Sequence, residues 1–166
     1  MKNTQKSITR AITRGAAVAA LYTALTLVSA VFGLSSGVIQ LRLSESLCLL
    51  PLVMPEATLG LYAGCMISNF ITGCAPWDIV FGSLATLIGA YLGRVMYLRL
   101  SVHPIIATLP TVLSNAVIVP FVLMFAYGAE GSYLYFFLTV GIGELLSATL
   151  IGWPVYKKLS PFVMRM

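Results

Sequence analysis

The stretch GVIQLRLSESLCLLPLVMPEATLG, residues 37–60, decides the fold because it determines whether the chain crosses a membrane five or six times. It carries opposite charges at Arg42 and Glu45, with apolar sequence on both sides. Such a pair is costly in lipid, so we expect it at a membrane surface or in a cavity within the protein. The apolar segment 44–53 is too short to span upright, and prolines close it. We expect a half-span or a tilted, kinked helix there.

The composition around this stretch is that of a polytopic membrane protein. The chain has 166 residues, of which 59% are hydrophobic and 9% charged, whereas soluble domains have about 25% charged residues. The mean hydropathy is +0.96. A spanning helix needs roughly 20 apolar residues, so the chain has room for five or six helices and short loops. We expect one all-α domain at residues 11–156, between basic cytoplasmic tails at 1–10 and 157–166.

Six apolar segments can be assigned along the chain. We expect helices over residues 11–32, 44–53, 56–71, from about 77 to the basic pair at 94 and 99, 104–127 and 133–153. With six spans, both termini share one side. That side then carries nine of the ten Lys and Arg residues, and the other carries only Arg42. The positive-inside rule therefore favours six spans with cytoplasmic termini over a five-span alternative.

Several functional classes are disfavoured by the sequence. The net charge of +5 comes from three separate basic clusters rather than one continuous face, which argues against nucleic-acid binding. The three cysteines and the lone histidine, His103, do not have metal-ligand spacing. No glycine-rich phosphate loop follows a strand. We therefore expect no enzyme, no metal site and no cofactor in this chain.

Polar residues within apolar segments are the candidates for function, because each must be held against a desolvation cost of several kcal/mol. Glu144 lies about eleven residues into the last helix, so it should lie roughly 17 Å deep, near the midplane. Asn115 lies at a similar depth, although asparagines also join helices to each other. Trp77 is a candidate for stacking or for the interfacial belt. The expected outward-opening substrate pocket comprises Arg42, Glu45, Asn69, Trp77, Asn115 and Glu144.

A stripe of small residues marks the first helix. Ala16, Ala20 and Ala24 recur every four residues, and such faces allow close approach of another helix. The spacing alone does not distinguish a helix of the same chain from a partner subunit.

Over residues 16–154 the chain resembles the QueT family, the substrate-binding (S) components of energy-coupling factor (ECF) transporters. The resemblance is carried by the runs VIQLRLSESLCLLPLVMPEATLGLYAGCMISN, WDIVFGSLATLIGAYL and VGIGELLSATLIGWPV. It implies a six-helix protein of a prokaryotic cell membrane that docks onto a coupling subunit and two ATPases, which use the ATP. It also implies that the alanine stripe contacts the coupling subunit and that the loop with Arg42 acts as a lid.

The resemblance implies a queuosine precursor, such as queuine or a related 7-deazaguanine base, as the substrate. A carboxylate can accept the paired N–H donors of such a base, and Asn or Arg can donate to the neighbouring carbonyl. We expect either Glu144 or Glu45 to read this edge and the other to face an exocyclic amine. An S component for another vitamin-like substrate and a stand-alone secondary carrier remain the alternatives.

Overall fold

The computed structural model describes residues 2–34 and 40–165, and these residues form a helical bundle. In this described part, seven helical elements are followed by one long composite helix of three segments. The elements are α1 (Lys2–Val31), the 3-10 turns η1 (Leu43–Leu47) and η2 (Leu50–Leu52), α2 (Ala57–Ile71), α3 (Pro76–Leu100), the 3-10 turn η3 (Ile106–Thr108), α4 (Leu109–Phe125), α5 (Tyr133–Glu144), the π-helical segment η4 (Leu145–Ile151) and α6 (Gly152–Arg165). The predicted all-helical class is confirmed.

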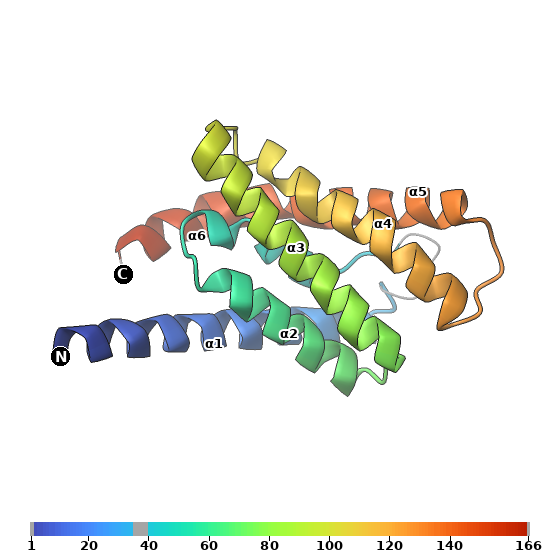
Figure 1. The fold of residues 1–166 in the computed structure, drawn as a ribbon, viewed down its shortest axis with the longest axis horizontal. Coiled ribbons are helices and arrows are strands. Elements are labelled where there is room, and N and C mark those ends of the chain that lie inside the picture. Colours follow the sequence, from blue (N-terminus) through green and yellow to red (C-terminus); the bar gives the residue numbers. More distant parts are fainter. Residues whose placement is uncertain (1, 35–39, 166) are drawn as a thin grey trace.

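Successive passes run in alternating directions, and both termini lie at the same end of the bundle (Figure 1). We call this the terminal end, and the opposite end, with the connections after α1, α2 and α4, the distal end. The chain makes six passes: α1, η1 with η2, α2, α3, α4, and α5 continuing into α6. Nine of the ten basic residues belong to the first half of α1, the last two turns of α3 and α6, which lie toward the terminal end, whereas Arg42 directly precedes η1.

Four helices are long and apolar enough to cross a membrane, namely Ser7–Val31, Pro76–Leu100, Ile106–Phe125 and Tyr133–Arg165. The apolar segments Leu43–Leu52 and Ala57–Ile71 are shorter. Residues 44–52 are all buried, so this pass runs through protein rather than along lipid. Short, irregular backbone is tolerated at membrane depth in that situation. The half-span interpretation of residues 44–53 therefore fits the structure.

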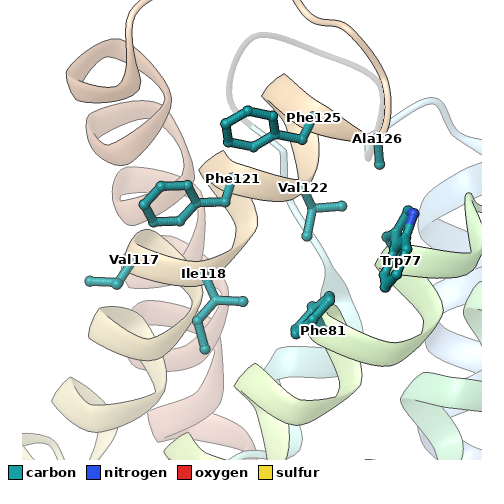
Figure 2. A pocket seen from close by; sticks show the side chains of 8 residues that line it. All are labelled: Trp77, Phe81, Val117, Ile118, Phe121, Val122, Phe125 and Ala126. Carbon is teal, nitrogen blue, oxygen red and sulfur yellow. The ribbon is translucent and has the colours of Figure 1, made fainter.

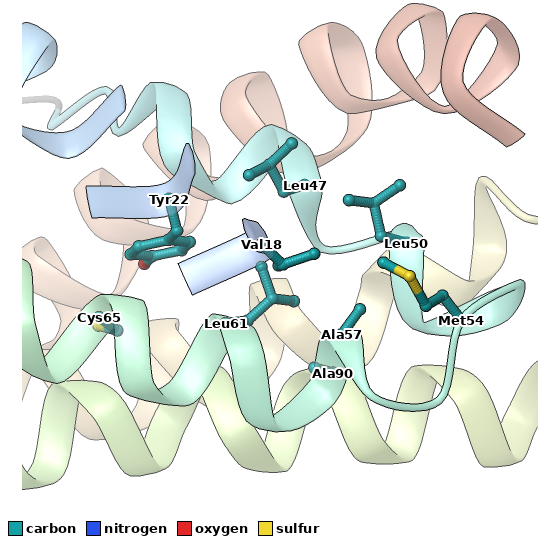
Figure 3. Close-up of a cluster of buried hydrophobic side chains, with 9 residues drawn as sticks. All are labelled: Val18, Tyr22, Leu47, Leu50, Met54, Ala57, Leu61, Cys65 and Ala90. Atoms are coloured by element: carbon teal, nitrogen blue, oxygen red, sulfur yellow. The ribbon is translucent and has the colours of Figure 1, made fainter. Parts of the chain in front are cut away.

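Helices α1 and α2 pack backbone to backbone through two glycines of α2. A Cβ atom at Gly60 would lie 2.5 Å from the Gly15 carbonyl oxygen, and one at Gly64 would lie 2.8 Å from that of Ala19. Figure 3 shows the apolar cluster beside this contact, to which α1, η1, η2, α2 and α3 all contribute. Its members are Val18, Tyr22, Leu47, Leu50, Met54, Ala57, Leu61, Cys65 and Ala90.

Helices α3 and α4 approach each other in the same way near the terminal end. A Cβ at Gly89 would lie 2.5 Å from the Cα of Thr111, and one at Gly93 would lie 2.5 Å from the Ala107 carbonyl oxygen. Toward the distal end, pockets open on both sides of this helix pair. One lies inside the bundle and the other on its outer surface.

The expected tails are helical over their described residues. Helix α1 begins at Lys2, before the expected start at residue 11, and α6 continues to Arg165 rather than ending near residue 153. The C-terminal extension is amphipathic, and Val155, Leu159 and Val163 pack against the core cluster. The helix passes Pro154 directly after the π-helical segment. The expected end near residue 153 was therefore wrong, because these contacts stabilise the helix beyond the proline.

Candidate functional site

A cavity of about 500 Å³ lies between the helices, lined by residues near the distal end of the bundle. Ligand pockets of proteins usually measure about 300–1,000 Å³. Side chains from α1 to α4 and from three connecting segments form its wall, with one cation and one anion among them. The lining residues are Thr26, Ala30, Gln40, Arg42, Asn69, Thr72, Cys74, Asp78, Val119, Leu123 and Tyr127.

Asp78 is the carboxylate of this cavity. It lies in the first turn of α3 and is only 5% exposed. The Tyr127 hydroxyl donates to Asp78 Oδ2 at 2.9 Å and accepts the Ala75 N–H at 3.0 Å, which joins the start of α3 to the residues after α4. Asp78 Oδ1 is buried without a hydrogen-bond partner in the described part of the chain. A Cβ at Gly82 would lie 2.8 Å from this oxygen, so glycine there leaves it room.

Arg42 is the cation of the cavity, and its backbone is fixed on two sides. Its N–H donates to Ser147 Oγ of η4 at 3.2 Å, and the next N–H, of Leu43, donates to Ser29 Oγ of α1 at 3.0 Å. Burial alone would lower the pKa of Arg42. The neighbouring negative groups, foremost the Asp78 carboxylate, outweigh this effect, so the pKa lies above its ordinary value. Within residues 2–34 and 40–165 the guanidinium forms no ion pair. It is thus a charged donor available to a ligand.

A second carboxylate adjoins the cavity at a narrow pocket of about 10 Å³. Gln40, Arg42 and Val119 line both spaces, so the two are neighbours. Glu144 and Asn115 complete the narrow pocket together with Val140. Glu144 is 7% exposed, and its Oε2 has no hydrogen-bond partner among the described residues.

One glycine and two asparagine amides position the loop and the helices around these charged groups. A Cβ at Gly143 would lie 2.2 Å from the Gln40 carbonyl oxygen, so glycine lets the loop before η1 approach α5. The Asn69 amide donates to the Asp78 carbonyl at 3.3 Å, and the Asn115 amide donates to the Thr111 carbonyl at 3.1 Å. Both asparagines therefore have a structural role as well as a place in the pocket wall.

Four of the six residues expected to bind substrate lie together, namely Arg42, Asn69, Asn115 and Glu144. Glu45 is enclosed instead. It is 1% exposed, and its Oε1 accepts hydrogen bonds from the Tyr22 and Thr86 hydroxyls. Glu45 forms no ion pair with Arg42. Of the expected lid, residues 35–39 lie outside the described part of the chain.

Trp77 is directed away from the cavity. It is 62% exposed and lines a separate apolar pocket between α3 and α4 (Figure 2). Its neighbour Asp78 faces another side of the helix and lies in the cavity wall. Asp78 and Tyr127 line the cavity as well, although neither was among the residues expected from the sequence. A carboxylate in the first turn of a helix is explained by the helix dipole alone, so Asp78 gave no separate signal of a cavity. No local pattern links residue 78 to residue 127.

The alanine stripe of α1 lies on the outer surface of the bundle. Ala16, Ala20 and Ala24 are all exposed, because α2 packs against the opposite face through Gly60 and Gly64. Among the described residues no group of three His, Cys, Asp or Glu side chains could hold a metal ion.

Comparison with known proteins agrees with these features. A protein from Lactococcus lactis subsp. cremoris (strain MG1363), described as queuosine precursor transporter QueT, is 38% identical over 96 residues. The aligned part covers 57% of this chain and 56% of the relative, so the match spans just over half of each protein. No solved structure matches the chain. The profile of the family described as QueT transporter matches residues 12–161, and the chain therefore belongs to this family of transporters.

Proposed function

We propose that this protein is the membrane-embedded substrate-binding component of an ECF-type importer and that it captures a queuosine precursor, a 7-deazaguanine base. The observation that carries the proposal is the set of charged groups around the cavity. The Arg42 guanidinium, which forms no ion pair among the described residues, lies with two buried carboxylates. These are Asp78 and Glu144, each of which has an oxygen without a partner in the described chain. The name of the Lactococcus relative supports the same substrate class.

The narrow side of the cavity suits the edge of the base. Glu144 accepts the paired N–H donors of the deazaguanine ring, and Arg42 or Asn115 donates to the adjacent carbonyl. These groups are buried, so leaving them unpaired costs free energy that a matching base recovers. A ligand without this donor and acceptor pattern leaves the carboxylate unpaired and binds weakly.

The wide side of the cavity receives the arm of the base. Asp78 Oδ1 accepts from an aminomethyl cation, while Oδ2 stays bonded to Tyr127. Charge-assisted hydrogen bonds of this kind are worth about 1.5–3 kcal/mol. Glu45, which was expected to share this role with Glu144, is replaced by Asp78 in the proposal because Asp78 lines the cavity.

The distal end faces the outside in this proposal, and the terminal end faces the cytoplasm. The support is the basic half of the bundle, since Lys and Arg near span ends favour the cytoplasmic side. The cavity then opens toward external substrate, and both termini are cytoplasmic in a prokaryotic cell membrane.

The exposed alanine stripe docks onto the coupling subunit, whose two ATPase partners hydrolyse ATP. Ala16, Ala20 and Ala24 leave a shallow face on α1 that a second helix can approach closely. The Ala20→Leu variant should lose the complex with the coupling subunit in detergent pull-downs. Ala63→Leu, at a partly exposed alanine on α2, is the matched control and should keep it. Loss in neither variant, or in both, contradicts docking through this face.

Substrate identity is tested by thermal shift and titration calorimetry on the purified protein. The panel contains queuine, its aminomethyl precursor, riboflavin, thiamine and folate. We expect tight binding of the two deazaguanines only, and their affinity should fall about tenfold or more in Glu144→Gln. Binding of a vitamin with no binding of either deazaguanine would reject the substrate assignment.

The energy source is tested in liposomes. Concentrative uptake should require co-reconstituted coupling and ATPase subunits with internal ATP. Concentrative uptake by this chain alone, driven by an ion gradient, would instead identify a secondary carrier.

A further inference from the structure

An apolar groove of about 440 Å³ lies on the outer surface between the distal halves of α3 and α4 (Figure 2). Two stacked aromatic pairs form its sides. Trp77 and Phe81 on α3 have ring centroids 5.9 Å apart, and those of Phe121 and Phe125 on α4 are 6.4 Å apart. Each pair is spaced four residues apart, so each follows the axis of its helix. The complete lining is Trp77, Phe81, Val117, Ile118, Phe121, Val122, Phe125 and Ala126.

The groove and the polar cavity lie on opposite sides of the same helix pair. Val122 and Trp77 line the groove, whereas the adjacent residues Leu123 and Asp78 line the cavity. The groove is exposed on its outer side, since Trp77 is 62% and Phe125 81% accessible. It is therefore a separate feature from the proposed substrate site.

The surroundings of the groove identify its occupant. Helices α3 and α4 are both long and apolar enough to cross a membrane, so the groove opens toward lipid. A partner helix would be expected at small residues that allow close approach, as on α1, whereas this groove is lined almost entirely by large aromatic and branched side chains. A polar ligand would find no charged side chain in the lining. A flexible hydrocarbon chain lying along the two helices fits both its composition and its shape.

We propose that this groove binds one acyl chain of a membrane lipid. The Trp77 indole, at the first turn of α3, lies at the rim of the groove near the end of the span, where tryptophan sits at the headgroup level. The bound chain braces α3 against α4 beside the Tyr127–Asp78 hydrogen bond. The proposal depends on the membrane location of the chain and not on the identity of the substrate.

The chain has only two tryptophans, Trp77 and Trp153, which makes a direct test possible. The Trp153→Phe protein, with Trp77 as sole fluorophore, is reconstituted in vesicles of phosphatidylcholine and phosphatidylglycerol. A rising share of the phosphatidylcholine is brominated in one acyl chain. Trp77 emission should fall in proportion to the share of brominated lipid and be mostly lost when all the phosphatidylcholine is brominated, because one bound chain is held against the indole.

Groove-filling variants separate a bound chain from lipid that merely surrounds the protein. In Val117→Phe, or alternatively Ile118→Phe, quenching should require a higher share of brominated lipid. Val80→Phe is the control, since Val80 is 48% exposed on the same helix as Trp77 but does not line the groove. Identical quenching curves for parent, groove and control variants would overturn the proposal. Quenching that weakens as protein density rises would also overturn it, because a second copy would then cover the groove.

Discussion

Two buried carboxylates in this bundle have nearly the same partners but different surroundings. Asp78 accepts a hydrogen bond from Tyr127, and Glu45 accepts one from Tyr22. Each also has a second oxygen without a partner among the described residues. However, Asp78 lines a cavity of about 500 Å³, whereas Glu45 is enclosed between α1, η1 and α3.

In the proposed function, access to a cavity rather than burial or charge distinguishes the carboxylate that binds the ligand from the structural one. The tyrosine near Asp78 comes from the distal surface, and its hydroxyl also accepts a backbone N–H. Glu45 is instead held from two helices by hydroxyl donors, Tyr22 of α1 and Thr86 of α3. Glu45 thus links η1 to α1 and α3, whereas Asp78 faces a space that a ligand can fill.

The largest expected effect is on substrate affinity in Asp78→Asn. This variant loses the charge opposite the aminomethyl cation, so affinity for the aminomethyl base should fall about tenfold to a hundredfold. Affinity for the same base with an uncharged nitrile arm should change little. Calorimetry on both ligands measures the difference.

Glu45→Gln is the matched control for this experiment. It removes a buried charge of the same sign while keeping an acceptor for Tyr22, and it should bind both bases as the parent does. A larger loss of affinity in Glu45→Gln than in Asp78→Asn would reverse the roles assigned to the two carboxylates. An equal loss for both bases in Asp78→Asn would place the carboxylate on the ring edge instead.

A somewhat smaller effect, on stability, is expected from Glu45→Ala. This change leaves the buried hydroxyl of Tyr22 without its acceptor, which costs about 1–3 kcal/mol. The midpoint of thermal unfolding in detergent should fall clearly below that of the parent. Asp78→Ala should lower it less, because water in the cavity can hydrate Tyr127, which is 47% exposed. Equal shifts would show that the two regions contribute alike to stability.

The sequence was sufficient for the six alternating passes and for most of the charged residues around the cavity. Apolar length and the basic clusters determine the passes, because lipid penalises charge in a way that depends little on detailed packing. Asn115 and Glu144, which were expected at similar depth, line one pocket. The structure thus places Asn115 and Glu144 side by side, as their positions along the helices predicted, and their role in binding stays a prediction.

The predictions that failed depended on which side of a helix faces inward. Trp77 and Asp78 are neighbours in sequence, yet one faces the groove and the other the cavity. Glu45 follows Arg42 by only three residues, yet only Arg42 lines the cavity. Rotation of a short apolar segment is set by tertiary contacts such as that of Gly143 with the loop at Gln40. No local pattern encodes those contacts.

The smallest expected effects come from removing the two tyrosine hydroxyls, and they test the comparison most closely. Tyr127→Phe frees Asp78 Oδ2 and loosens the α3 start from the residues after α4. Affinity for the aminomethyl base should fall about threefold to tenfold with little change in unfolding midpoint, since one hydrogen bond is worth about 0.5–1.5 kcal/mol. Tyr22→Phe should do the opposite, lowering the midpoint while leaving affinity unchanged, because its hydroxyl serves only the enclosed region. If both variants changed the same property, access would not be what distinguishes the two carboxylates.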